Sequence, residues 1–121
     1  MENGTTEKFA QLLIRYVRDA AVRSCDQDLS PTSRAPIAQR WRTEKFNPNA
    51  MIPDCVDKTI FHLLYAIDQG AIRLSFQSQD GNFVDLTEEG LSELAGWFMG
   101  SGGWRAMYSS ERFHDDFADL V

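Results

Sequence analysis

Residues 86–117, with the sequence LTEEGLSELAGWFMGSGGWRAMYSSERFHDDF, decide the fold that we predict for this chain. Thr87 is suited to cap a helix whose first turn carries Glu88 and Glu89, because carboxylates are stabilised at the positive end of a helix dipole. The apolar residues that follow recur at helical spacing and form one stripe: Leu91, Leu94, Ala95 and Phe98. The pattern predicts one amphipathic helix that needs a core to pack on.

Glycines end this predicted helix at residues 100–103, which read Gly-Ser-Gly-Gly. Glycine adopts positive φ at little cost and favours the position just past a helix end. Trp97 and Trp104 flank the corner. Beyond it, Ser109 or Ser110 can cap a last helix in which apolar residues share one face: Phe113, Phe117 and Leu120. We expect two helices joined by a tight turn, with tryptophan packed beneath it.

The composition fits one globular domain spanning residues 1–121, because 43% of the 121 residues are hydrophobic. The net charge of −6 argues against nucleic acid or an anionic membrane as the main partner, since both favour clustered Lys and Arg. Residues 1–73 carry 10 basic and 9 acidic side chains (net +1), whereas residues 74–121 carry 2 basic and 9 acidic ones (net −7). This asymmetry is typical of a solvated acidic face, and it also fits a surface that meets a basic partner.

The N-terminal residues lack a basic start followed by an apolar run, and other apolar runs are too short to span a bilayer. The two cysteines, Cys25 and Cys55, fall in no CxxC or metal-binding spacing. We interpret them as small buried residues of a reducing compartment, although the sequence leaves a disulfide between them open. These observations predict a cytoplasmic protein.

Helical periodicity is clearest in residues 6–25, where apolar side chains recur every three or four residues. Residues 26–53 contain all 4 prolines and are expected to form an irregular connection. A short helix over residues 35–46 is compatible with this connection, because proline is tolerated in a first helical turn. Long connections often carry binding loops, so this region is a candidate for function.

A further helix is expected to begin near Pro53 or Asp54 and to end at Gly70. Its apolar stripe is wide, which indicates a central, buried position: Val56, Ile60, Leu63, Leu64 and Ile67. His62 lies among these residues. A lone histidine in such surroundings is usually a core or boundary residue rather than a ligand.

The apolar period changes to two in residues 71–86, which predicts a β-hairpin with a three-residue Gln-Asp-Gly loop at residues 79–81. This register places four apolar side chains on one face: Phe76 opposite Val84, and Leu74 opposite Leu86. The predicted fold class is therefore α+β, a mostly helical single domain of about four to five helices with one two-stranded antiparallel hairpin near residues 71–86.

Basic residues surround a tryptophan in the irregular connection: Arg34, Arg40, Trp41, Arg42 and Lys45. Such a cluster can bind an anion or a nucleic acid. Alternatively, the tryptophan anchors the connection to the core while the arginines pair with the acidic C-terminal half. We favour the second interpretation, since long charged side chains commonly cover apolar surface.

No motif predicts a catalytic residue, a metal site or a cofactor. His62 and His114 are the only histidines, and neither belongs to an HExxH pattern. The glycines at residues 100–103 could cradle a phosphate, but no strand precedes them and no Walker lysine follows. A chain corner is the better interpretation of these glycines.

We predict a small acidic, non-enzymatic module that binds another protein. Its partner surface would comprise acidic residues of the C-terminal half: Glu88, Glu89, Glu93, Asp115 and Asp116. The alternative is a small-molecule binder or enzyme with an aromatic and arginine-lined pocket: Trp41, Arg42, Trp97, Gly102, Gly103, Trp104 and Arg105. Homodimerisation through the free edge of the hairpin is compatible with either function.

Overall fold

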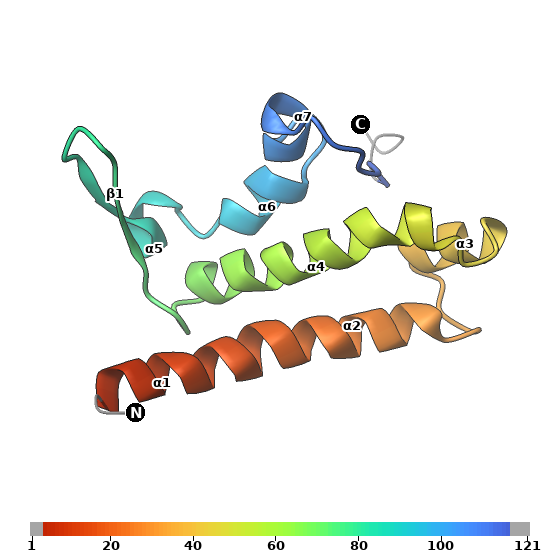
Figure 1. Cartoon of the computed structure of the whole chain (residues 1–121), viewed down its shortest axis with the longest axis horizontal. Helices are drawn as coiled ribbons and strands as arrows, with labels where there is room; N and C mark the ends of the chain where they lie inside the picture. Colours follow the sequence, from red (N-terminus) through yellow and green to blue (C-terminus); the bar gives the residue numbers. More distant parts are fainter. Residues whose placement is uncertain (1–3, 117–121) are drawn as a thin grey trace.

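The computed structural model describes residues 4–116, and two long helices lie side by side in it (Figure 1). The elements follow in this order: α1 (Gly4–Leu13), the π-helical turn η1 (Ile14–Arg18), α2 (Asp19–Leu29), α3 (Pro36–Thr43), α4 (Pro48–Asp68), β1 (Ser75–Gln77), β2 (Phe83–Asp85), α5 (Leu86–Glu89), α6 (Leu94–Met99) and α7 (Trp104–Tyr108). Counting α1, η1 and α2 as one, the described residues contain six helices and a two-stranded antiparallel sheet. The predicted mostly helical α+β fold is confirmed.

The first long helix runs without interruption over residues 4–29, because α1, η1 and α2 follow one another directly. It confirms the helix predicted over residues 6–25 and extends it at both ends. Val17 and Ala21 are buried on the face that packs against α4. Near the C-terminal end of the helix, Asp28 forms an ion pair with Lys58 of α4, which fixes the last turn in place.

α4 begins earlier than predicted, at Pro48. The Asn47 side chain caps this start by accepting a hydrogen bond from the Asn49 backbone N–H at 3.0 Å. The prediction that the helix starts near residue 53 is wrong, because Pro53 is accommodated inside the helix. Pro53 has no N–H for the Asn49 carbonyl, and Arg112 Nε donates a hydrogen bond to that carbonyl oxygen instead, at 3.0 Å.

The irregular connection is therefore shorter than the predicted residues 26–53. Its first residues belong to α2 and its last ones to α4, which leaves two short linkers around α3. The short helix predicted over residues 35–46 is present as α3, with Pro36 in its first turn. Lys45 and Phe46 adopt positive φ values of 56° and 55°, and this turn leads the chain from α3 into α4.

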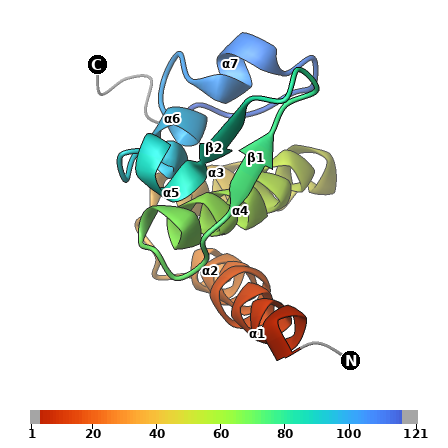
Figure 2. The same ribbon diagram turned by 90° about the vertical axis from the view of Figure 1, so that its left-hand side faces the viewer.

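The hairpin has the predicted register, with Phe76 paired to Val84. Gly81, in the predicted three-residue loop, has the positive φ that such a loop requires. Of the four apolar side chains that the predicted register places on one face, Phe76 is exposed. The strands have only three residues each, and Figures 1 and 2 show the hairpin extending beyond the end of α4.

The predicted amphipathic helix starting at Thr87 is interrupted, and this part of the prediction is wrong. Asp85, rather than Thr87, caps α5 by accepting a hydrogen bond from the Thr87 N–H at 3.0 Å. Leu91 and Ser92 then adopt positive φ, and Leu91 is 72% exposed. Asp68 at the end of α4 starts a new helix, α6, by accepting backbone hydrogen bonds from residues 94 and 95, both at 2.9 Å.

The glycine corner at residues 100–103 is confirmed, and Gly102 has a positive φ of 71°. α7 follows it directly, beginning at Trp104. The last helix predicted from Ser109 or Ser110 is absent from residues 109–116, which have no helical conformation. Two residues of its predicted apolar face, Phe117 and Leu120, lie outside the described residues.

The core lies around the C-terminal half of α4 and joins both long helices to the C-terminal part of the chain. Its buried apolar members are Val17, Ala66, Ile67, Ile72 and Leu94. α4 contacts the first helix on one side and α6 on another, which confirms its predicted central position. Among residues 4–116, none of the helices combines the length and the apolar character needed to cross a bilayer.

Candidate functional site

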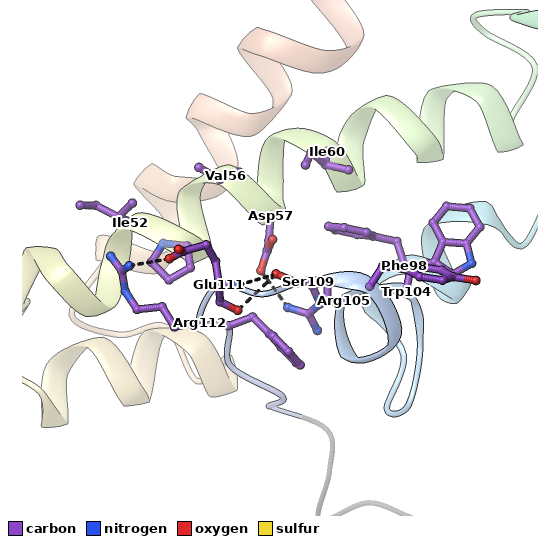
Figure 3. Close-up of a pocket in the computed structure, with 13 residues that line it drawn as sticks. Ile52, Val56, Asp57, Ile60, Phe98, Trp104, Arg105, Ser109, Glu111 and Arg112 are labelled. Atoms are coloured by element: carbon purple, nitrogen blue, oxygen red, sulfur yellow. Dashed lines mark hydrogen bonds and ion pairs between the residues drawn. The ribbon is translucent and has the colours of Figure 1, made fainter. Parts of the chain in front are cut away.

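Two concave sites share a wall formed by the ion pair between Asp57 of α4 and Arg105 of α7. Arg105 Nη1 lies 2.8 Å from Asp57 Oδ2. The larger site, which we call the groove, has a volume of about 670 Å³ and is shown in Figure 3. The smaller site, which we call the polar cavity, has a volume of about 330 Å³.

The floor of the groove is a ridge of apolar side chains on α4. Ile52, Val56 and Ile60 are 55%, 53% and 37% exposed. Residues four apart share one face of a helix, and the eight residue steps from Ile52 to Ile60 span about 12 Å. The opposite wall comes from α6, α7 and the segment after α7. It includes four aromatic side chains, Phe98, Trp104, Tyr108 and Phe113, and the charged side chains of Glu111 and Arg112. Figure 3 labels Phe98, Trp104, Glu111 and Arg112.

Arg105 supports this lining and is itself only 6% exposed. Its guanidinium donates hydrogen bonds to Asp57, at 2.8 Å, and to the carbonyl oxygens of Met99, at 3.0 Å, and His114, at 3.2 Å. The guanidinium carbon also lies 4.8 Å from the ring centre of Phe113, which is a cation–π distance. Arg105 thus joins α4, the end of α6 and the segment after α7 into one wall.

A second charge network surrounds Asp54 beside the polar cavity. Arg40 donates to both Asp54 oxygens, at 2.8 and 3.0 Å, and also to Asp116, while the Trp41 indole N–H donates to Asp54 at 2.7 Å. Burial alone would raise the pKa of Asp54, but the hydrogen bonds from Arg40 and Trp41 outweigh it and hold the pKa below its usual value. Trp41 is thus buried and anchored, and Arg40 pairs with Asp116 of the C-terminal half. For these two residues, the favoured interpretation of the basic cluster is confirmed.

The carboxyl groups of Asp54 and Asp57 on α4 respond to their surroundings in opposite directions. Burial raises the pKa of Asp57, and the hydrogen bond from Arg105 only partly offsets this effect. Asp54 has a lowered pKa because it accepts three side-chain hydrogen bonds from Arg40 and Trp41. Both aspartates have a cationic partner, Arg40 for Asp54 and Arg105 for Asp57. Their main role is therefore structural, because these ion pairs hold the walls of the two sites together.

His62 and the Asp28–Lys58 ion pair also line the polar cavity. Burial lowers the pKa of His62, and the positive charges of Lys58 and Arg23 lower it further, so the imidazole is neutral at pH 7. Its ring meets the edge of Phe61 at a centroid distance of 5.4 Å. His62 is half-buried, as expected for a boundary residue. Across residues 4–116, no three His, Cys, Asp or Glu side chains are grouped so that they could hold a metal ion.

The residues of the predicted aromatic and arginine pocket occupy different places. Trp104 and Arg105 line the groove, and the ring centre of Trp97 lies 6.2 Å from that of Trp104. Trp41 is instead buried in the network around Asp54. Arg42 donates to two carbonyl groups of the connection before α3, at 3.2 and 2.7 Å. Ligand binding by these residues stays a prediction.

Gly102 and Gly103 shape the corner between α6 and α7. A Cβ atom on Gly103 would lie 2.2 Å from the Trp97 carbonyl oxygen, so the close approach of these backbones requires glycine. Gly102 supplies the left-handed turn, with φ at 71°. The tight chain reversal between α6 and α7 therefore accounts for both glycines.

The acidic residues predicted as a partner surface fall in two separate regions. Glu88, Glu89 and Glu93 lie in and after α5, where Glu88 pairs with Arg73 at 3.0 Å. Asp115 and Asp116 belong to the segment after α7, and Asp116 pairs with Arg40 of α3 at 2.8 Å. Glu89 and Glu93 are exposed. Partner binding by this acidic set stays a prediction.

Ile52 and Asp57 line the groove, although no sequence pattern predicted them as site residues. Val56 and Ile60 were predicted in a buried stripe, which is wrong because both are exposed on the groove floor. One signal was available: Asp54 and Asp57 interrupt the apolar stripe of this helix three residues apart, and buried carboxylates require cationic partners.

Comparison with known proteins finds no matching family model, no matching curated protein and no matching solved structure.

Proposed function

We propose that this chain is a non-enzymatic binding module that takes up a cationic amphipathic helix of another protein in the groove. The observation that carries this proposal is the exposed apolar ridge of Ile52, Val56 and Ile60 on the groove floor. An apolar surface that is concave and open is typical of an interaction site. Its length of about 12 Å matches roughly two turns of a bound helix, whose apolar side chains recur at i, i+3 or i+4, and i+7.

The charge distribution supports a basic partner. The aromatic lining belongs to residues 74–121, which carry 2 basic and 9 acidic side chains. Both basic residues line the groove and are paired there, Arg105 with Asp57 and Arg112 with Glu111. The attraction for a basic partner therefore comes from the net charge of this part of the chain, not from the groove lining itself. Lys and Arg residues beside the apolar face of a partner would therefore be attracted over some distance, an effect that speeds association and weakens as salt increases.

A small-molecule site in the polar cavity has less support. Its charged groups are engaged in pairs within the chain, Asp28 with Lys58 and Asp54 with Arg40. Trp41, a central residue of the predicted pocket, is buried and donates its indole N–H to Asp54. The groove instead has an exposed apolar ridge of Ile52, Val56 and Ile60 along its floor, and such a ridge favours a macromolecular partner.

The proposed compartment is the cytoplasm. Cys25 and Cys55 are free thiols, and Cys55 is exposed. Free exposed thiols are typical of reducing compartments, whereas oxidising ones favour disulfides.

The proposal is tested with two labelled peptides in a fluorescence anisotropy titration. The first contains only Leu and Lys, with leucines at helical spacing, and in the second each Lys is replaced by Glu. We expect the Leu–Lys peptide to bind, and its affinity to fall at least about tenfold, or 1.4 kcal/mol, for Val56→Asp. The matched control is Thr59→Asp at another exposed position of α4 that lies outside the groove lining, and this variant should bind as the wild type does.

Three outcomes would overturn the proposal. If neither peptide binds, the groove does not accept a helix. Equal binding of both peptides would contradict the preference for a basic partner. Unchanged affinity of Val56→Asp would place the binding site elsewhere on the protein.

A further inference from the structure

The first long helix, residues 4–29, contacts the fold along one side and leaves a flank uncovered (Figures 1 and 2). Along this flank runs a set of exposed side chains that we call the flank stripe: Ile14, Arg18, Val22, Asp26 and Leu29. Each member follows directly after a residue that is at least half-buried: Leu13, Val17, Ala21, Cys25 and Asp28. Because successive helical residues are about 100° apart, the flank stripe lies to one side of the α4 contact.

The apolar members of the flank stripe are unusually exposed for a well-packed helix. Ile14, Val22 and Leu29 are 47%, 46% and 47% exposed. The whole chain exposes 8301 Å². A compact monomer of 13.8 kDa exposes only roughly 6,600 Å². The surplus of roughly 1,700 Å² per chain is larger than the about 800 Å² that each partner contributes to a stable protein–protein interface.

The order of residues in the flank stripe is self-complementary. It reads apolar, basic, apolar, acidic, apolar, with Val22 at its centre. Reversing the direction exchanges the basic position with the acidic one and leaves the apolar positions in place. Two copies laid antiparallel therefore bring opposite charges together, whereas two parallel copies would bring like charges together.

We propose that a second copy of this chain packs against the flank stripe in antiparallel orientation, with the two-fold axis at Val22. Ile14 then packs against the partner's Leu29, and Arg18 pairs with the partner's Asp26. An isologous interface repeats each of these contacts twice. The spacing of four residues from Ile14 to Asp26 forms a continuous ridge of the kind that interdigitates when two helices pack.

Within one chain, Arg18 donates a hydrogen bond to Asp19 at 2.8 Å. Their side chains are 68% and 41% exposed, and ion pairs in such positions contribute little to stability. Arg18 is therefore able to turn to the partner at small cost. The groove lies on the α6 and α7 side of α4, away from the first helix, so the dimer would carry two accessible grooves (Figure 1).

The test is a charge exchange followed by sedimentation velocity at low and high micromolar concentration. We expect the wild type to dimerise, and Arg18→Asp and Asp26→Arg to be monomeric, because each places like charges in contact twice. An equimolar mixture of these two variants should dimerise again, since both cross-pairs are then opposite in sign. The double variant should also dimerise.

The matched control is Lys8→Asp, which makes the same charge change on the same helix at an exposed position six residues before Ile14, the first member of the flank stripe. It should dimerise as the wild type does. A monomeric wild type at high micromolar concentration would overturn the proposal. So would a mixture of the two single variants that stays monomeric while circular dichroism shows both to be folded.

Discussion

Arg105 is expected to act as an internal support of the groove, and a double-mutant cycle with Asp57 tests this role. Arg105→Met removes the cation beside Asp57, whose side chain is only 13% exposed. Breaking one partner of a buried ion pair costs about 3–5 kcal/mol, a large share of the roughly 5–15 kcal/mol by which a typical domain is stable. In the double variant with Asp57→Leu no charge is left unpaired, so its cost should fall below the sum of the two single costs by about 1–3 kcal/mol.

The assay is urea denaturation followed by far-UV circular dichroism, since urea is uncharged and does not screen the ion pair. Arg112→Met is the matched control, because Arg112 also lines the groove but is exposed, with its side chain at 45%. It should cost less than about 1 kcal/mol. Additive costs in the cycle, or equal costs for the two arginine variants, would refute the support role and make Arg105 a candidate ligand group.

Three further predictions concern packing, thiol reactivity and pH. Gly90→Ala should destabilise the fold by about 1–3 kcal/mol in urea denaturation, because a Cβ there would lie 2.5 Å from Leu94 Cγ; a stabilised variant would contradict this packing. Burial and the adjacent Cys55 raise the pKa of Cys25 to about 11, so iodoacetamide should modify exposed Cys55 first in the folded protein, as peptide mass spectrometry can show. The pKa of His62 is lowered in the folded state, so as the pH falls the unfolded chain is protonated at this residue before the folded protein is. Stability should therefore fall as the pH drops below 6.5. The same fall in His62→Gln would exclude this cause.

The parts of the fold that local patterns determine could be predicted. The hairpin register follows from alternation and from Gly81 in the loop, and the structure pairs Phe76 with Val84 as expected. The first helix could be predicted as well, because its buried apolar residues recur at helical spacing over many turns. Proline was the less reliable signal, since Pro53 lies inside α4, where Arg112 takes over the hydrogen bond that proline cannot make.

The break between α5 and α6 could not be predicted, because its cause lies elsewhere in the chain. The local sequence suits one continuous helix. Asp68 instead accepts hydrogen bonds from the N–H groups of Leu94 and Ala95, residues far along the chain, and this starts α6 anew. The reversal also requires positive φ at Leu91 and Ser92, which are not glycines, and Gly90 directly before them, the C-cap of α5, has a negative φ.

The candidate site was only partly predictable for a related reason. Trp104 and Arg105 were identified as site residues because aromatic and basic side chains meet at the glycine corner, and both line the groove. The apolar pattern of α4 could not show which part of its wide apolar stripe would be covered. Val56 and Ile60 were expected in the core, yet α6 and α7 leave them open to solvent.

The most direct test of the groove as a binding site is a set of ¹H–¹⁵N correlation spectra recorded as the Leu–Lys peptide is added. The chain has 3 tryptophans, and each gives its own indole N–H signal. Trp104 lines the groove, whereas Trp41 is buried and donates its indole N–H to Asp54 at 2.7 Å. We predict that the Trp104 signal and the backbone signals of Val56 and Ile60 shift together, while the Trp41 signal stays in place. Shifts that spare Trp104 and the groove floor, or that are centred on Trp41, would contradict the account.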